Sequence, residues 1–408
     1  MEAARTERHE VAIVGGGIAA LEAVLYLRAI TDGSADVVVI SPDPEFVYRP
    51  LIVREPFSPE TAERRDLRAL LASIGADLIV GRVESVESDD HLIQLEGDQQ
   101  VAYGQALIAA GSQLQSPYSS AETLWTGEPP TSFDQILRQV PDDGRLNLIV
   151  PPGATWSLPI YEFALMGARR LDEVRPDVRL TIVTPEQAPL IIFGTAASGE
   201  IADLLELRSI GFRPDTWVIE NERGELREGA DGATIEGVSL ALPVMAGRPI
   251  GGLPVDRGGF IPIDEFCRVR GLEDVFAAGD GTSFPIKQGG IATQQADTAA
   301  AGIASALGFA ADAQPFHPVL RGKLLTGGES LHMHTDAAGG DGEGVVSSDY
   351  LWWPPHKVSG RYLAPWLARE SLTHELEPPA RTIDVEVSMP HEWHSEPMSR
   401  SQPAAGSS

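Results

Sequence analysis

Short apolar runs and helix-periodic segments follow one another along the first part of the chain. Val11–Val14 and Val37–Ile40 are apolar at every position, which is typical of parallel strands buried on both faces. Between them, residues 18–30 carry apolar side chains at helical spacing. The order strand, helix, strand predicts a βαβ unit near the start of the chain.

The same patterns continue to residue 306 and predict an α/β fold. The expected strands are residues 78–80, 92–95, 106–110, 146–150, 178–184, 240–243, 259–263 and 275–280. The expected helices are residues 64–73, 160–171, 197–210 and 291–306. The elements after residue 145 form a second α/β unit, and the run at 275–280 returns the chain to the first.

The first glycines of the chain stand where a nucleotide-binding loop requires them. Gly15, Gly17 and Ala20 fit the pattern G-x-G-x-x-G/A between a strand and a helix. Gly15 permits a tight turn, Gly17 lets the backbone approach a pyrophosphate, and Ala20 allows close helix–strand packing. The free amides near Ile18 and Ala19 then face the negative oxygens. A tight turn without a ligand is the alternative.

An acidic residue usually ends the second strand of such a unit and binds ribose hydroxyls. Ser41 occupies that place and is followed by Asp43. We expect Ser41 to make one hydrogen bond without charge assistance, a loss of about 1 kcal/mol. Asp43 is the alternative ribose-binding residue.

A second cofactor-binding motif lies far along the chain, at residues 275–280. Gly279 permits a close approach, and Asp280 accepts hydrogen bonds from the hydroxyls of a ribityl chain. The helix after residues 288–290 would direct its positive N-terminus at a flavin, and Lys287 precedes it. A cation there would raise the reduction potential of the flavin, and an exposed loop lysine is the alternative. A ligand held from both motifs indicates FAD in a domain split in sequence.

These motifs together resemble the FAD-dependent pyridine nucleotide–disulfide oxidoreductases over residues 10–310. Within them the chain is most similar to the branch of type II NADH dehydrogenases, sulfide:quinone oxidoreductases and flavocytochrome c sulfide dehydrogenases. Besides the two motifs above, the resemblance rests on residues 46–51, 81–83, 108–112 and 288–296. It implies an α/β fold with two Rossmann-like, FAD- and NAD(P)-binding domains, the first split in sequence, plus a short C-terminal unit.

The resemblance also implies site residues. Arg49 and Pro50 would lie beside the flavin, the backbone of Val83 would meet the adenine, and Ala109 to Gly111 would pass under the pyrophosphate. We expect the complete FAD site to comprise Gly15, Gly17, Ile18, Ala19, Ser41, Arg49, Pro50, Val83, Ala109, Gly111, Gly279, Asp280, Gln288, Gly290 and Ile291.

Domain boundaries follow from the same comparison. We expect an FAD-binding domain at 1–118 and 256–312, and a second Rossmann-like domain with a degenerate NAD(P) loop at 119–255. A C-terminal interface or lid unit would cover 313–369. Residues 370–408 are rich in Ser, Pro and Glu without periodicity, so we expect a disordered tail there.

The loop that would bind NAD(P)H departs from the family pattern. Pro151 and Pro152 remove two backbone N–H donors, and Gly153 is the one glycine left. Because a pyrophosphate needs those amides, we doubt ordinary NAD(P)H binding. The longer loop resembles that of the sulfide-oxidising members, which place a reactive cysteine there; here Trp156 stands at or beside that place.

The single cysteine, Cys267, excludes an intrachain disulfide and leaves no thiol pair for exchange beside the flavin. We expect Cys267 to be a buried packing residue in a strand-like run. Near the flavin this leaves three candidate functional residues, Trp156, Tyr161 and Glu162. Trp156 stacks on a ring or packs in the core, and Glu162 moves protons or serves the helix dipole. With Lys287, Tyr161 and Glu162 are the candidate catalytic residues.

Charge and composition limit the partners. The net charge is −28 with three lysines, which argues against nucleic acid and against docking on anionic lipid. Solubility alone is the other explanation of this acidity. The N-terminus lacks an apolar signal core, so we expect a cytoplasmic protein. His332 and His334 form an H-x-H without a third ligand, and we expect no metal.

The aromatic, basic stretch at 351–366 is expected to be a packed lid or a homodimer contact. Weak peripheral contact with a lipid surface is the alternative, since paired tryptophans suit a membrane interface. Three hypotheses for the function remain. The first is an FAD-dependent oxidoreductase passing electrons from a small-molecule donor to a small acceptor such as a quinone. The second uses NAD(P)H through an altered loop, and the third is a flavin-binding redox sensor or scaffold without turnover.

Overall fold

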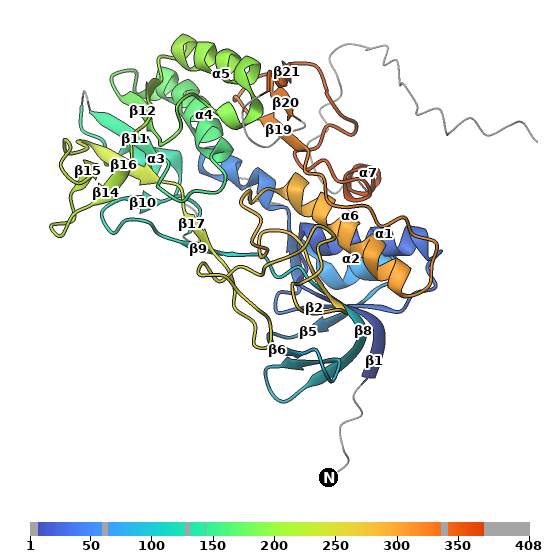
Figure 1. The fold of residues 1–408 in the computed structure, drawn as a ribbon. Coiled ribbons are helices and arrows are strands. Elements are labelled where there is room, and N and C mark those ends of the chain that lie inside the picture. Colours follow the sequence, from blue (N-terminus) through green and yellow to red (C-terminus); the bar gives the residue numbers. More distant parts are fainter. Residues whose placement is uncertain (1–6, 59–63, 127–130, 143, 336–341, 371–408) are drawn as a thin grey trace, which may run out of the picture. The chain divides into compact units, whose positions relative to one another are not determined.

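The computed structural model describes residues 7–58, 64–126, 131–142, 144–335 and 342–370. Figure 1 shows its helices and strands along the chain. The expected disordered tail at 370–408 lies, after Glu370, outside the described residues.

The first sheet brings together strands from both ends of the expected split domain. Its order is β5-β2-β1-β8-β7-β6, and β18 pairs with β8. The strands β1, β2, β5, β8 and β18 run parallel, and β7 is antiparallel to both of its neighbours, β8 and β6. The bounds are β1 Glu7–Val14, β2 Val37–Ser41, β5 Asp77–Val80, β6 Val83–Glu87, β7 Leu92–Leu95, β8 Gln100–Ile108 and β18 Val275–Ala277.

Both faces of this sheet are buried, as its continuous apolar strands require. Along β1, Val11 and Ile13 belong to one core cluster, and Ala12 and Val14 to another. The helices of this part are α1 (Ile18–Ile30), α2 (Leu67–Ser73) and α6 (Gly289–Ala306). Helices α1 and α6 pack side by side (Figure 1).

The second sheet has the order β10-β16-β11-β12-β13, and all of its pairs are parallel. Its strands are β10 Glu122–Thr123, β11 Arg145–Ile149, β12 Arg179–Val183, β13 Gly211–Arg213 and β16 Val238–Ala241. Its helices are α3 (Phe133–Leu137), α4 (Leu158–Val174) and α5 (Thr195–Leu207). Helix α4 has a buried apolar face that contacts β11 and β12. This is a second Rossmann-like arrangement.

Smaller elements connect and flank the two sheets. They are β3 Glu45–Val47 with β4 Arg64–Asp66, β9 Gln113–Gln115 with β17 Val244–Ala246, β14 Val218–Glu220 with β15 Leu226–Glu228, and the 3-10 helices η1 Arg49–Phe57 and η2 Ile191–Phe193. The C-terminal part has the antiparallel strands β19 Leu320–Leu324, β20 Leu331–Thr335 and β21 Val345–Ser347, followed by α7 Leu363–Arg369. It contacts α1, α4, α5 and α6.

The predicted fold class is confirmed, but three local predictions were wrong. The expected helix at 64–73 begins only at Leu67, because residues 64–66 pair as β4 with β3. Residues 259–263 form isolated bridges at Ile261 and Ile263 instead of a strand. Cys267 lies in a turn with a φ of 59°, although it is fully buried as expected.

Candidate functional site

The glycine loop joins β1 to α1 at the carboxyl edge of the first sheet. Gly15 has a φ of 117°, and a Cβ there would lie 2.2 Å from the carbonyl oxygen of Ala109. A Cβ at Gly17 or Gly111, in contrast, would meet no atom within 4 Å. Among the described residues no side chain caps α1, so its first amides lack a protein acceptor there. This open helix N-terminus fits a pyrophosphate.

Asp280 lies at the same edge, carried there by the pairing of β18 with β8. Ala278 N donates to Ile108 O at 3.0 Å, and Gly279 N donates to Gln295 Oε1 at 2.8 Å. Burial raises the pKa of Asp280, and the nearby charges of Lys287 and Arg49 partly oppose that rise. Within the part of the chain that the structure describes, no group donates a hydrogen bond to this carboxylate. It therefore fits a partner with hydroxyl donors, as a ribityl chain has.

Lys287 is buried beside this edge. Its Nζ donates to the carbonyls of Thr282 and, at 2.7 Å, of Phe284, and it lies 3.9 Å from the ring centre of Phe260. Burial lowers its pKa to about 8, against the attraction of Asp280. The side chain is thus held by the loop that follows Asp280, and its expected role at the flavin stays a prediction.

The N-terminus of α6 is covered by the C-terminal part of the chain. Gln288 caps the helix, with Oε1 accepting from Ile291 N at 2.9 Å. A Cβ at Gly289 would lie 2.7 Å from a methyl of Val358, and one at Gly290 would approach the hydroxyl of Ser359 at 3.4 Å. Residues 358–359 therefore lie directly against this helix end.

The other expected cofactor residues surround the same edge. Arg49 and Pro50 begin η1, and the hydroxyl of the preceding Tyr48 accepts a hydrogen bond from Val358 N at 3.2 Å. Val83 begins β6. The hydroxyl of Ser41 is bound in a local turn: it donates to the carbonyl oxygen of the exposed Asp43 at 2.9 Å.

The carboxyl edge of the second sheet is occupied by its own side chains. Glu186 follows β12 and accepts hydrogen bonds from Ser157 Oγ at 2.8 Å, Tyr161 Oη at 2.6 Å and Thr184 Oγ1 at 3.0 Å. Burial raises the pKa of Glu186, and the three hydrogen bonds oppose that rise. The pKa of Tyr161 lies well above its usual value, chiefly through burial, so its phenol stays neutral.

Sequence reasoning missed Glu186. Its signal was available, since the end of the second strand of a Rossmann unit is where a ribose-binding acid is expected. Two of the hydroxyls that bind it, those of Ser157 and Tyr161, come from the loop and helix in which pyrophosphate-binding groups would lie. Trp156, on the same loop, packs edge-on against Phe193 with ring centres 5.7 Å apart.

Glu162 forms a buried ion pair with Lys357 of the C-terminal part. Its other oxygen accepts from Leu325 N at 2.9 Å, and its own side chain is fully buried. Burial raises the pKa of Glu162, whereas Lys357 lowers it. Lys357 directly precedes the segment on the α6 N-terminus, so the ion pair lies next to that segment in the chain.

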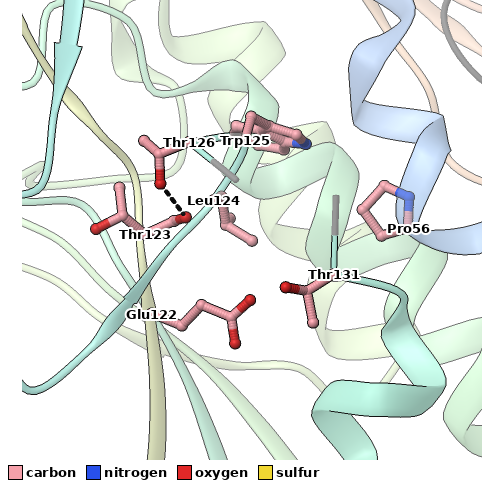
Figure 2. A pocket seen from close by; sticks show the side chains of 7 residues that line it. All are labelled: Pro56, Glu122, Thr123, Leu124, Trp125, Thr126 and Thr131. Carbon is pink, nitrogen blue, oxygen red and sulfur yellow. Dashed lines mark hydrogen bonds between the residues drawn. The ribbon is translucent and has the colours of Figure 1, made fainter. Parts of the chain in front are cut away.

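A separate cavity of about 240 Å³ lies between η1 and the β10 region. Figure 2 shows its lining residues Pro56, Glu122, Thr123, Leu124, Trp125, Thr126 and Thr131. It contains none of the expected site residues and is smaller than ordinary ligand pockets of about 300–1,000 Å³. In the described part of the chain, no cluster of three potential metal ligands occurs, and no helix is long and apolar enough to span a bilayer.

The fold and the open glycine loop define a flavin-dependent oxidoreductase of the two-dinucleotide-domain class. The chain belongs to the pyridine nucleotide-disulphide oxidoreductase family, whose pattern matches residues 9–301. The expected FAD cofactor is thereby confirmed, as is the oxidoreductase class. No curated protein matches the chain.

Solved structures share the fold at low identity. The sulfide:quinone oxidoreductase of the hyperthermophilic bacterium Aquifex aeolicus is 19% identical with a TM-score of 0.73, over 84% of this chain and 87% of its own. A chain of the Tetrahymena thermophila mitochondrial ATP synthase is 13% identical with a TM-score of 0.63, over 91% and 95%. Putidaredoxin reductase, in a covalent complex with putidaredoxin, is 18% identical with a TM-score of 0.56, over 80% and 81%.

Proposed function

We propose that this flavoenzyme takes electrons from a donor other than NAD(P)H and passes them to a small acceptor of the quinone class. The main support is the carboxyl edge of the second sheet, where the polar side chains bond to one another; we call this the closed edge. A dinucleotide bound there needs free loop amides and a free acidic residue for its ribose. The prolines of the loop supply no amides, and Glu186 already accepts three hydrogen bonds.

The sulfide chemistry of thiol-containing relatives is not supported either. Cys267 is fully buried, and burial raises the pKa of its thiol, so thiolate is not formed at neutral pH. A single buried thiol cannot form and exchange a disulfide with substrate. The quinone class of acceptor is supported by the similarity to the Aquifex aeolicus enzyme, whose name states that activity.

When bound, FAD supplies the two-electron chemistry, and each quinone reduced to a quinol takes up two electrons and two protons. The chain supplies binding and proton-holding groups. Asp280 binds the ribityl chain of the cofactor, and the N-terminus of α1 binds its pyrophosphate. Lys287 provides positive charge beside Asp280. The buried pair of Glu162 and Lys357 is the proposed proton-holding group, because a carboxyl and an amine in contact can exchange a proton.

Anaerobic titration at the flavin absorbance band tests the proposal. NADH, NADPH and sulfide are each added to the oxidised holoprotein, which we expect to stay yellow. The flavin is then reduced with dithionite, excess reductant is removed, and a water-soluble quinone is added under argon. We expect rapid reoxidation in proportion to the quinone added.

Each alternative has its own outcome. Rapid bleaching by NADH or NADPH would show that the second edge opens to a nucleotide, and the donor proposal would be wrong. Bleaching by sulfide would show that the missing thiols do not matter. Failure of quinone to reoxidise the flavin, with normal FAD content, would favour a redox sensor or scaffold.

A further inference from the structure

Arg248 reaches the carboxyl edge of the first sheet from the second half of the chain. It follows β17, which pairs antiparallel with β9 (Figure 1). In this pair Ala246 lies opposite Gln113. Two residues further along, Arg248 Nε donates to Ser112 O at 3.2 Å. Ser112 directly follows Gly111, where an added Cβ would meet nothing within 4 Å. The guanidinium group therefore lies beside the open space at Gly111, at the carboxyl edge of the first sheet.

The backbone at this point is tightly held, which fixes where the side chain begins. Gly247 N donates to Gly258 O at 2.8 Å, and a Cβ at Gly247 would lie 1.9 Å from the carbonyl oxygen of Gly259. Because the backbone before Arg248 is fixed by these contacts, the Arg248 side chain starts from one defined position near the carboxyl edge of the first sheet. The bond to Ser112 uses only Nε and leaves both terminal nitrogens for another acceptor.

The charges around Arg248 are of one sign. Its pKa is lowered first by burial and then by the neighbouring positive charges of Arg49 and Arg82. Arg82 pairs with the exposed Glu96, at 3.2 Å between Nε and Oε1. Arg49 lies close enough to Asp280 for its charge to lower the pKa of that carboxyl, but within the described residues neither Arg49 nor Arg248 forms a contact ion pair with a carboxylate. The chain carries 59 acidic residues against 31 basic ones, so unpaired arginines close together are unexpected by composition. Such a cluster favours the binding of an anion from outside the chain.

We propose that Arg248 binds the pyrophosphate of FAD with its two terminal nitrogens, opposite the amides of the α1 N-terminus. Arginine suits this role because its planar fork binds phosphate oxygens in pairs. The consequence is that cofactor binding ties the β9–β17 pair, and with it the second half of the chain, to the first sheet. Neither the glycine motif nor the Asp280 motif contains this contact.

The test measures binding to the apoprotein and needs no electron donor, so its failure is separate from a failure of the proposed quinone reaction. Dissociation constants of FAD, ADP and riboflavin are measured for the parent, Arg248→Gln, Arg248→Lys and Arg270→Gln. ADP carries the pyrophosphate without the flavin, and riboflavin carries the flavin without phosphate. Arg270 is the matched control, since its Nε also donates to a backbone carbonyl, Ile263 O at 3.0 Å, but away from this cluster.

We expect Arg248→Gln to weaken FAD and ADP about tenfold or more and to leave riboflavin unchanged. The dependence of the FAD dissociation constant on salt should become shallower, because one phosphate contact is lost. Arg248→Lys should fall between the two, since it keeps the charge without the fork. The control should match the parent for all ligands.

Two results would overturn the proposal. The first is FAD and ADP affinity within twofold of the parent in Arg248→Gln. The second is an equal loss for riboflavin, or an unchanged salt dependence, which would assign Arg248 a structural role through Ser112. If the Gln variant does not fold, as judged by circular dichroism, the Lys variant decides between the same outcomes.

Discussion

The parallel strands of the two sheets end in similar carboxyl edges, but the polar groups of the first edge are open and those of the second are bonded to one another. At the first edge the helix N-terminus has no side-chain cap, and the carboxylate of Asp280 has no hydrogen-bond donor in the described chain. At the second edge Glu186 already accepts hydrogen bonds from Ser157, Tyr161 and Thr184. The comparison teaches that a Rossmann-like unit keeps its architecture when the groups that would bind a ligand form hydrogen bonds with one another instead. Buried polar groups must be bonded, either by a ligand or internally.

The largest effect should come from closing the first edge sterically. Gly15→Ala places a Cβ 2.2 Å from Ala109 O at a φ of 117°, so we expect a loss of about 3 kcal/mol or more in unfolding free energy. Urea unfolding of the apoprotein measures it. Gly17→Ala is the control: it meets no atom within 4 Å, so stability should hold within about 0.5 kcal/mol while FAD affinity falls. Equal stability loss in both variants would contradict this account.

Paired carboxylate variants test the comparison directly. Asp280→Asn should weaken FAD about 10- to 100-fold without lowering apoprotein stability, because the charge-assisted bonds exist only with the ligand. Glu186→Gln should cost about 1–3 kcal/mol of stability without changing FAD affinity, since hydroxyl donors lose a charged acceptor. FAD fluorescence titration and urea unfolding measure the two quantities. The comparison fails if the effects are exchanged or shared.

The unfolding free energy should depend on pH through two carboxyl groups, Asp297 on α6 and Glu22 on α1. Burial and the neighbouring Glu22 raise the pKa of Asp297 to about 9, and burial raises that of Glu22 as well. Between the ordinary value of 3.8 and about 9, the folded protein holds a proton that the unfolded chain releases. The unfolding free energy should therefore fall as pH rises through this window, by about 1.4 kcal/mol per pH unit at most for each proton held. Urea midpoints at pH 6 and 8.5 should differ less in Asp297→Asn; an identical shift would contradict the assignment.

The smallest effect is expected at the lone thiol. Cys267→Ala should cost about 1 kcal/mol through lost packing and leave the flavin spectrum and its response to sulfide unchanged. Absorbance titration of parent and variant side by side checks this. A sulfide response that disappears with the thiol would show that Cys267 takes part in chemistry.

The sequence predicted elements well where local pattern decides. Residues 18–30 form the expected helix because their apolar spacing and the glycine before them are local features. Residues 64–66 were misassigned because their strand depends on pairing with residues 45–47, which no local window contains. Residues 259–263 are apolar and extended but have no neighbouring strand to pair with over their length.

The candidate site was likewise predictable where its residues lie on local motifs, and not where they meet through long-range contacts. The glycine loop and Asp280 lie on local motifs, and the structure brings them to one sheet edge. The contacts of Glu186, Lys357 and Arg248 join segments 25 to 195 residues apart. One sequence does not show which of these side chains pair, so the position of Glu186 after the second strand and the missing amides were the only local signals of the closed second edge.

Glu22 accepts hydrogen bonds from the backbone of Tyr362 at 2.9 Å and of Leu363 at 2.6 Å, and a Cβ at Gly360 would lie 2.6 Å from the same carboxylate. A shortened chain ending near residue 312 would leave that buried acid without either amide and deprive Glu162 of its ammonium partner. Designers of minimal or fused versions should therefore keep the polypeptide through residue 370, and should attach any added protein beyond it.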